Sequence, residues 1–259
     1  MKYKMVAVDL DDTILHKDKT ISEYTQAVFE RLSENVKIVV ATSRAIQRAG
    51  EYARQLHASA LVSLNGAVVY DGETLIKTTP ISEKVVRSLL SELSQITPIE
   101  LSIVKPEVVY TTDRYFIDRG ESLPIDLTDY DAGEVQRIYA TTPNHEVLHA
   151  LPLERMGLKL IQSQPKNYPD FHTIVRQEVN KAEGLKVLCE RFNILPEEVV
   201  AFGDEDNDFD MIRFAGCGVA MGNAIDALKA QADDVAATNE EDGVAKWIES
   251  HRDMFNRGC

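Results

Sequence analysis

Residues 6–13 read Val-Ala-Val-Asp-Leu-Asp-Asp-Thr and place the carboxylates of Asp9 and Asp11 directly after a run of apolar residues. The run predicts a buried β-strand over residues 5–8. Side chains alternate along a strand, so we expect the two carboxylates to lie on the same side and to share a divalent cation. In an open α/β sheet, ligands bind at the carboxyl ends of the strands. Taken alone, the pair is equally compatible with a solvated loop or a helix cap.

The pattern that follows this strand predicts a doubly wound parallel sheet. We expect strands at residues 5–8, 37–41 and 60–64, which alternate with helices at residues 21–32 and 45–56. The strand runs are continuously apolar, which is typical of parallel strands covered by helices on both faces. Thr20 and Glu23 have the spacing of a capping box at the start of the first helix.

The C-terminal part of the chain has the same α/β character. We expect a helix over residues 180–192, with Asn180 as its N-cap and Glu183 at its third position. The other expected elements are strands at residues 198–202, 218–221 and 235–237, a helix at 208–214 closed by Gly216, and a helix at 224–232 capped by Asn223.

The middle of the chain differs from both ends. Prolines fall repeatedly between short strand-like runs, and the clearest elements are a helix at 85–93 and strands at 100–104, 108–111, 157–162 and 172–175. We therefore predict an α/β protein with a doubly wound, Rossmann-like parallel-sheet core. Residues 1–79 and 179–259 form this core, and residues 80–178 form an inserted α+β domain.

The balance of charge disfavours polyanionic partners. The chain of 259 residues carries 42 acidic and 28 basic side chains, a formal net charge of -14, which repels nucleic acid and anionic membranes. A phosphate ester would be repelled as well, so a site for one needs its own local positive charge. No cysteine pair, signal-peptide pattern or long apolar run is evident. We expect a cytoplasmic monomer or weak homo-oligomer that acts on a small molecule, without a nucleic-acid or membrane partner.

Four segments together resemble the signature of the haloacid dehalogenase superfamily. They are residues 6–13, the triplet Thr42-Ser43-Arg44, Lys181 at the start of a helix, and residues 203–208, which read GDEDND. The insert between the second and third segments is similar in position and size to the large α+β cap (C2 cap) of the Cof-type members. Residues 63–71, SLNGAVVYD, also look like the corresponding stretch of that group.

The resemblance implies that Asp9 is the nucleophile and Asp11 the general acid and base. An aspartate needs no deprotonation to attack phosphorus, and a covalent phosphoaspartate divides one difficult step into two easier ones. Asp11 would protonate the leaving oxygen and then deprotonate water, a role that suits a carboxyl whose pKa is raised by neighbouring acids.

The remaining site residues also come from the resemblance. Phosphate or substrate contacts are implied for Leu10, Thr42, Ser43, Lys181 and Asn207, and a Mg²⁺ site for Asp9, Asp11, Asp204 and Asp208. Carboxylates on separate loops are ligands that magnesium prefers. By itself, Lys181 would be read as a solvated side chain, and Asp208 as an acid at a helix N-terminus. Relatives usually have glycine at the positions of Asp12 and Ser43.

These observations predict a Mg²⁺-dependent phosphatase that hydrolyses a small phosphorylated metabolite through an aspartyl-phosphate on Asp9. The substrate class stays open among sugar phosphates, nucleotides and pyridoxal phosphate. One alternative is a phosphomutase acting on a sugar phosphate, which would need a basic cap, whereas the insert has only scattered arginines. Another is a catalytically weak regulator that binds phosphometabolites, which we would expect to have lost one of the site residues. The insert also contains His145, His149 and His172, which could either reach a substrate or be solvated; none has metal-ligand spacing with another.

Overall fold

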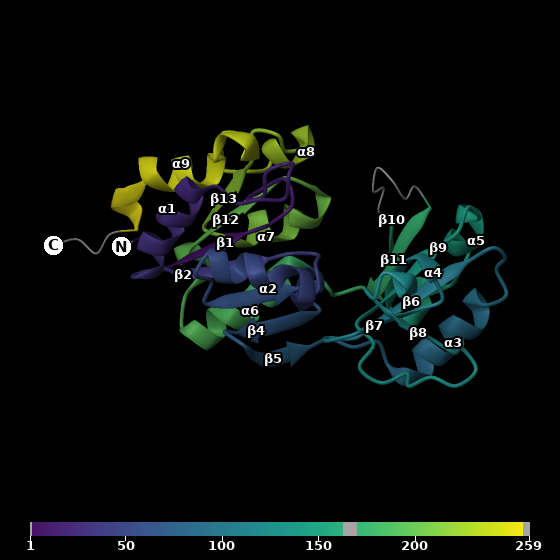
Figure 1. Cartoon of the computed structure of the whole chain (residues 1–259). Coiled ribbons are helices and arrows are strands. Elements are labelled where there is room, and N and C mark those ends of the chain that lie inside the picture. Colours follow the sequence, from purple (N-terminus) through teal and green to yellow (C-terminus); the bar gives the residue numbers. More distant parts are fainter. Residues whose placement is uncertain (1, 163–169, 256–259) are drawn as a thin grey trace. The chain divides into compact units, whose positions relative to one another are not determined.

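The computed structural model describes residues 2–162 and 170–255, and the chain divides into two compact units (Figure 1). The first unit consists of residues 1–77 and 180–259, and the second of residues 78–179. Among the described helices, none is long and apolar enough to cross a membrane.

The first unit is built on an eight-stranded sheet with the order β14-β13-β12-β1-β2-β3-β4-β5. Its strands are β1 (Met5–Val8), β2 (Lys37–Ala41), β3 (Ala60–Ser63), β4 (Val68–Asp71), β5 (Thr74–Thr78), β12 (Val199–Gly203), β13 (Cys217–Ala220) and β14 (Asp234–Val235). β1 pairs in parallel with both β2 and β12, so the predicted doubly wound parallel core is confirmed. The sequence patterns missed β4 and β5, and β4 runs antiparallel to β3.

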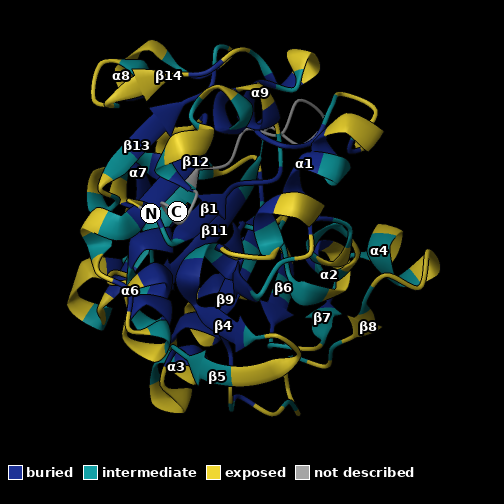
Figure 2. Ribbon diagram, turned by 90° about the vertical axis from the view of Figure 1, so that its left-hand side faces the viewer, coloured by how far each residue is buried: buried dark blue, intermediate teal, exposed yellow. Residues whose placement is uncertain are grey.

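Every residue of β1, β3 and β12 is buried, and Figure 2 shows β1 and β12 in dark blue. Burial of consecutive residues requires cover on both faces of the sheet, which explains their continuous apolar sequence. The helices of this unit are α1 (Glu23–Ser33), α2 (Ile46–Gln55), α6 (Lys181–Phe192), α7 (Phe209–Phe214), α8 (Asp226–Lys229) and α9 (Gly243–Ser250). Among them, α1 contacts α9, and α6 contacts α7.

Helix starts were predicted with mixed success. The Asn180 side chain accepts a hydrogen bond from the Glu183 N–H at 2.9 Å, so that cap is confirmed. The predicted Thr20 cap is wrong: Ser22 caps α1 by accepting from the Thr25 N–H at 3.0 Å. The predicted Asn223 cap is also wrong, because Asn223 instead donates to the backbone carbonyl of Asp12 at 2.7 Å and α8 begins three residues later. A capping side chain in the sequence therefore predicted that a helix begins nearby, but it did not reliably predict at which residue the helix begins.

The second unit has its own six-stranded sheet with the order β10-β11-β9-β6-β7-β8. The strands are β6 (Glu100–Val104), β7 (Val109–Thr111), β8 (Leu123–Pro124), β9 (Arg137–Thr141), β10 (Leu158–Gln162) and β11 (Phe171–Arg176), and the helices are α3 (Glu83–Leu93), α4 (Arg114–Asp118) and α5 (His145–His149). Leucines of α3 and apolar side chains of β6, β9 and β11 form one buried cluster. The second unit thus has a hydrophobic core of its own.

Candidate active site

The site lies at the carboxyl edge of the first unit's sheet. Val8, Val40 and Phe202 are aligned in the parallel register of β1, β2 and β12. The residues that follow these three strands therefore emerge at the same edge, where ligands bind in open α/β sheets. Asp9 follows β1 and Asp204 follows β12, so strands distant in sequence bring these two acids together.

Three buried carboxylates converge at this edge, those of Asp9, Asp204 and Asp208. Each offers one oxygen, and these oxygens all lie within 4.8 Å of one another. The ammonium of Lys181, at the first position of α6, is fully buried and lies 2.7 Å from Asp9 Oδ1 and 2.6 Å from Asp208 Oδ1. One lysine cannot neutralise three carboxylates. A set of oxygen donors with surplus negative charge suits a hard divalent cation such as Mg²⁺.

The protonation of these groups reflects that imbalance. Burial raises the pKa of Asp9 to about 7, with Lys181 lowering it and Asp208 raising it further. Burial, followed by the charges of Asp9 and Asp208, raises the pKa of Asp204 to about 8. Burial disfavours the ammonium of Lys181, but Asp208 and Asp9 outweigh that effect and leave its pKa raised. Without a further cation, the cluster therefore retains protons near neutral pH.

Short contacts hold the carboxylates in place. Asp208 Oδ2 accepts from the backbone N–H groups of Asp204 at 2.9 Å and of Glu205 at 3.2 Å. Thr13, two residues after Asp11, donates its hydroxyl to Asp204 Oδ1 at 2.7 Å. Asp208 thus aligns both Lys181 and the loop after β12.

Asp11 has a different environment from Asp9. Arg44 forms a bidentate pair with it, Nε to Oδ2 at 2.7 Å and Nη2 to Oδ1 at 2.6 Å, and Lys19 Nζ lies 2.8 Å from Oδ1. Burial opposes ionisation, but the hydrogen bonds from Arg44 and Lys19 outweigh it and lower the pKa of Asp11 to about 2. The expectation that neighbouring acids raise this pKa is wrong, because the carboxylate faces two cations instead of the acid cluster.

The predicted phosphate contacts lie around the same edge. Thr42 is buried and its hydroxyl accepts from the Arg44 N–H at 3.2 Å, while Ser43 is half-buried. The Leu10 side chain is fully buried, so only its backbone can serve a ligand. Asn207 donates to Asn65 Oδ1 at 3.3 Å. The roles assigned to these side chains stay predictions.

Sequence reasoning missed several residues that shape the site. Arg44 was quoted within its triplet without a role, and Lys19 and Thr13 carried no signal beyond their closeness to Asp9 and Asp11. A loop after β3 was missed as well: Leu64, Asn65 and Gly66 have successive positive φ angles of 53°, 56° and 98°.

Gly66 lies against the start of α6. A Cβ atom at this position would approach the backbone oxygen of Asn180 to 2.0 Å. The strained loop therefore packs directly against the residue that precedes Lys181. The sequence signal was the SLNG stretch, since Asn and Gly tolerate positive φ.

Comparisons with known proteins point to one family. The family model described as haloacid dehalogenase-like hydrolase matches residues 6–248. The chain is 31% identical over 264 residues to the 5-amino-6-(5-phospho-D-ribitylamino)uracil phosphatase YitU of Bacillus subtilis, covering 95% of this chain and 97% of that protein. It is 32% identical over 248 residues to YcsE of the same species, which has the same phosphatase name, covering 95% and 94%. A solved haloacid dehalogenase-like hydrolase from Bacteroides thetaiotaomicron superposes with a TM-score of 0.85 at 28% identity, covering 96% of this chain and all of the other (100%).

Proposed function

The chain belongs to the haloacid dehalogenase-like hydrolases, and on that premise we propose that it is a magnesium-dependent phosphatase that transfers the phosphoryl group of a small metabolite to Asp9. As a phosphoric monoester hydrolase of this family, it needs a nucleophile, a proton carrier and positive charge beside the phosphate. The observation that supports the proposal most is the buried Lys181 bridging Asp9 and Asp208, next to Asp204.

In the first step Asp9 attacks phosphorus. Lys181 holds Oδ1 of Asp9, so we assign the attack to Oδ2. A bond forms between this oxygen and phosphorus while the ester P–O bond breaks, and the leaving oxygen takes a proton from Asp11. In the second step water attacks the phosphoaspartate, gives a proton to Asp11 and releases phosphate. Asp9 is regenerated as a carboxylate.

A Mg²⁺ ion held by Asp9, Asp204 and Asp208 would supply the positive charge that keeps these acids ionised and that stabilises the phosphoryl oxygens. The need for such charge follows from the raised pKa values of Asp9 and Asp204. Lys181 neutralises part of the charge on Asp9 and fixes its orientation.

Asp11 must leave its partners to act as an acid. A guanidinium binds phosphate as well as carboxylate in a bidentate manner. We assign to Arg44 an exchange from Asp11 to the phosphoryl group when substrate binds, which frees Asp11 to take up a proton. The exchange would break the contacts of Arg44 with Asp11, which measure 2.6 and 2.7 Å in the structure.

The first substrate to test is 5-amino-6-(5-phospho-D-ribitylamino)uracil, because two relatives above 30% identity are named for it. Sugar phosphates, nucleotides and pyridoxal phosphate complete the panel, ranked by kcat/KM. The second unit, in this proposal, is the cap that selects the leaving group. Replacing residues 79–179 with a short linker should then abolish selectivity among metabolites while a small aryl phosphate is still hydrolysed. If the shortened protein folds and still selects among metabolites, the second unit does not determine substrate specificity.

The decisive experiment is to trap the phosphoenzyme. Wild-type protein is mixed with labelled substrate and Mg²⁺, quenched in acid and mapped by mass spectrometry, and we expect the label on Asp9. Asp9→Asn should lose turnover by roughly 10⁴-fold or more in a protein that still folds, as circular dichroism would show. Asp18→Asn, at an exposed acid outside the cluster, is the control. Label on another residue, or full activity in excess chelator, would refute the mechanism.

A further inference from the structure

The second unit contains three histidines that the proposed phosphatase chemistry does not use. His145 and His149 lie one turn apart on α5, and His172 lies on β11. The ring centroid of His172 is 5.0 Å from that of His145 and 6.1 Å from that of His149. His145 and His149 are four residues apart on the helix and therefore share one face. We call these three residues the histidine cluster.

Hydrogen bonds fix which ring nitrogens carry protons. His172 Nδ1 lies 3.0 Å from the backbone carbonyl of Asp170, and His145 Nε2 lies 2.9 Å from the carboxylate Oδ1 of the same residue. Both partners are acceptors, so both of these nitrogens must be donors. In neutral rings the two remaining nitrogens, His145 Nδ1 and His172 Nε2, then carry lone pairs.

These two lone-pair nitrogens face each other at 3.3 Å. Two facing lone pairs repel each other, so the pair is compatible with a proton carried by one of the rings or with a metal ion bound by both. The separation corresponds to a long hydrogen bond, just beyond the most common range of about 2.7–3.2 Å, so the distance is compatible with a shared proton. Two nitrogens at roughly 2.0–2.1 Å from a tetrahedral zinc ion are separated by about 3.3 to 3.4 Å. The rings are tilted by 54° to each other instead of being stacked.

We propose that the histidine cluster binds a divalent transition-metal ion of the zinc type through His145 Nδ1 and His172 Nε2. The surroundings match those of histidine ligands in metal sites, where the second ring nitrogen donates to a carboxylate or a backbone carbonyl. Here Asp170 supplies both acceptors. His172 is fully buried, and burial, together with the facing rings of His145 and His149, lowers its pKa. A neutral imidazole is the form that binds a metal.

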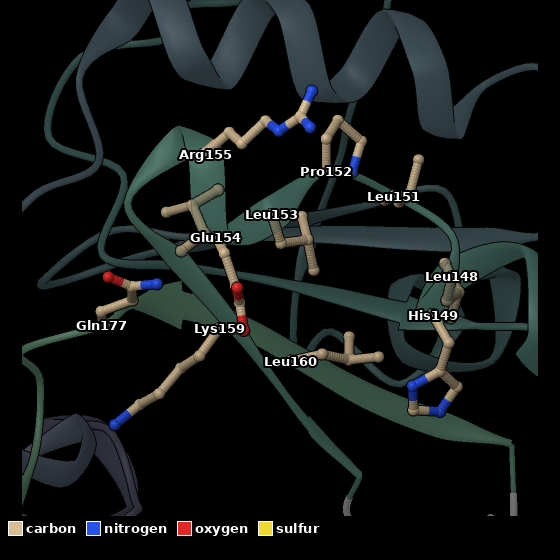
Figure 3. A pocket seen from close by; sticks show the side chains of 11 residues that line it. Leu148, His149, Leu151, Pro152, Leu153, Glu154, Arg155, Lys159, Leu160 and Gln177 are labelled. Atoms are coloured by element: carbon tan, nitrogen blue, oxygen red, sulfur yellow. The ribbon is translucent and has the colours of Figure 1, made fainter.

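His149 is the third ligand in this proposal, reached by turning its exposed ring toward the other two. It lines a pocket of about 510 Å³ beside Leu148 and Leu160, and Figure 3 shows its imidazole among the lining side chains. His149 itself is exposed to solvent, and water would complete a tetrahedral shell around an ion held by the three rings. The bound ion would tie α5 to β11.

The test is titration calorimetry of the full chain with Zn²⁺ in excess Mg²⁺, which occupies the carboxylate cluster and competes poorly for imidazole. We expect one zinc site. His145→Asn should abolish it, His149→Asn should weaken it, and Asp170→Asn, which removes only the orienting charge, should weaken it by about 10- to 100-fold. His57→Asn, at an exposed histidine of the first unit, should change nothing. Cobalt bound in place of zinc should show the intense visible bands of a tetrahedral nitrogen site.

Three results would overturn the proposal. One is the absence of zinc binding in a folded wild-type protein. Another is zinc binding that is lost in Asp204→Asn but kept in His145→Asn, which would put the ion in the carboxylate cluster. The third is ¹⁵N NMR evidence of a proton shared between His145 and His172 that excess zinc does not displace.

Discussion

Asp9 and Asp11 leave the same strand end but have opposite electrostatic surroundings. Asp9 lies among buried acids and has a pKa of about 7, whereas Asp11 is held by Arg44 and Lys19 and has a pKa of about 2. This difference is the reverse of what the proposed roles need, because the nucleophile must be ionised and the general acid protonated; a bound Mg²⁺ and the release of Arg44 from Asp11 would reverse it. Their sequence spacing alone could not reveal it.

The pKa of Asp11 should rise when Arg44 is replaced. Arg44→Met removes two charge-assisted hydrogen bonds that lower the pKa of Asp11. The burial of Asp11, which raises this pKa, then has the larger effect. We expect the pKa to move from about 2 to the ordinary carboxyl value or above it, followed by the ¹³C shift of the Asp11 carboxyl during acid titration. Arg54→Met, at a residue paired with exposed Glu51, is the matched control. A pKa that stays near 2 would mean that Lys19 suffices.

At the scale of elements, the loop after β3 and the start of α6 act as one structural unit. Gly66 has a φ of 98° and lies against Asn180, the N-cap that presents Lys181. Gly184, one turn along α6, is equally confined, since a Cβ there would lie 2.4 Å from a methyl group of Val62. Two glycines therefore allow α6 to approach β3 closely.

Gly66→Ala should impair catalysis more than it impairs folding of the remaining sheet. The added methyl group clashes with the Asn180 backbone, so α6 must move and carry Lys181 away from Asp9. Gly72→Ala is the matched control, because Gly72 also has a positive φ, 58°, but a Cβ there meets nothing within 4 Å. We expect the control to cost about 1 kcal/mol of unfolding free energy with kcat retained. Gly66→Ala should cost more and lower kcat by roughly 10²-fold, as misplacement of catalytic groups does. Equal effects of the two variants would contradict the role of the clash.

Strands and helices whose sequences directly reflect burial or capping were predicted well. β1, β2 and β3 are continuous apolar runs, and the capped start of α6 has side-chain hydrogen bonds that follow from residue type. β9 was missed because its arginine and tyrosine obscure the apolar alternation. The Asp11–Arg44 pair joins residues 33 positions apart, so its effect on pKa requires the three-dimensional structure. For Asp12 the structure explains a sequence observation: its φ is 57°, a conformation that favours glycine, which relatives usually have at this position.

For the whole molecule, two separate cores imply that the units respond differently to ligands. Mg²⁺ binds only the folded form of the acid cluster in our proposal, so it stabilises the first unit by mass action. The core around α3 in the second unit contains none of these acids. Thermal unfolding is therefore expected in more than one step.

In chelator, the stability of the first unit should fall as pH rises from about 5 to 8. The folded-state pKa values of Asp9 and Asp204, about 7 and about 8, exceed those of unfolded aspartate, so the folded state binds more protons in this window. Raising the pH removes these protons and destabilises the folded state. Calorimetry across this pH range should show the decline, and Mg²⁺ should reduce it. Asp204→Asn should flatten the slope, whereas Asp18→Asn should leave it unchanged. A rise in stability with pH in chelator would contradict the assignment.

The chain returns from the second unit to the first at a position with mechanical consequences. Lys159 of β10 holds the carbonyl of Val179 at 2.8 Å, and the next residue, Asn180, is wedged against Gly66. Lys181 comes directly after these two anchored peptides. The segment that leads back to the first unit is therefore anchored within two residues of the ammonium that contacts Asp9. A load applied to the second unit, by a bound metabolite or by an optical trap, would therefore act on the chain directly beside Lys181, the partner of Asp9.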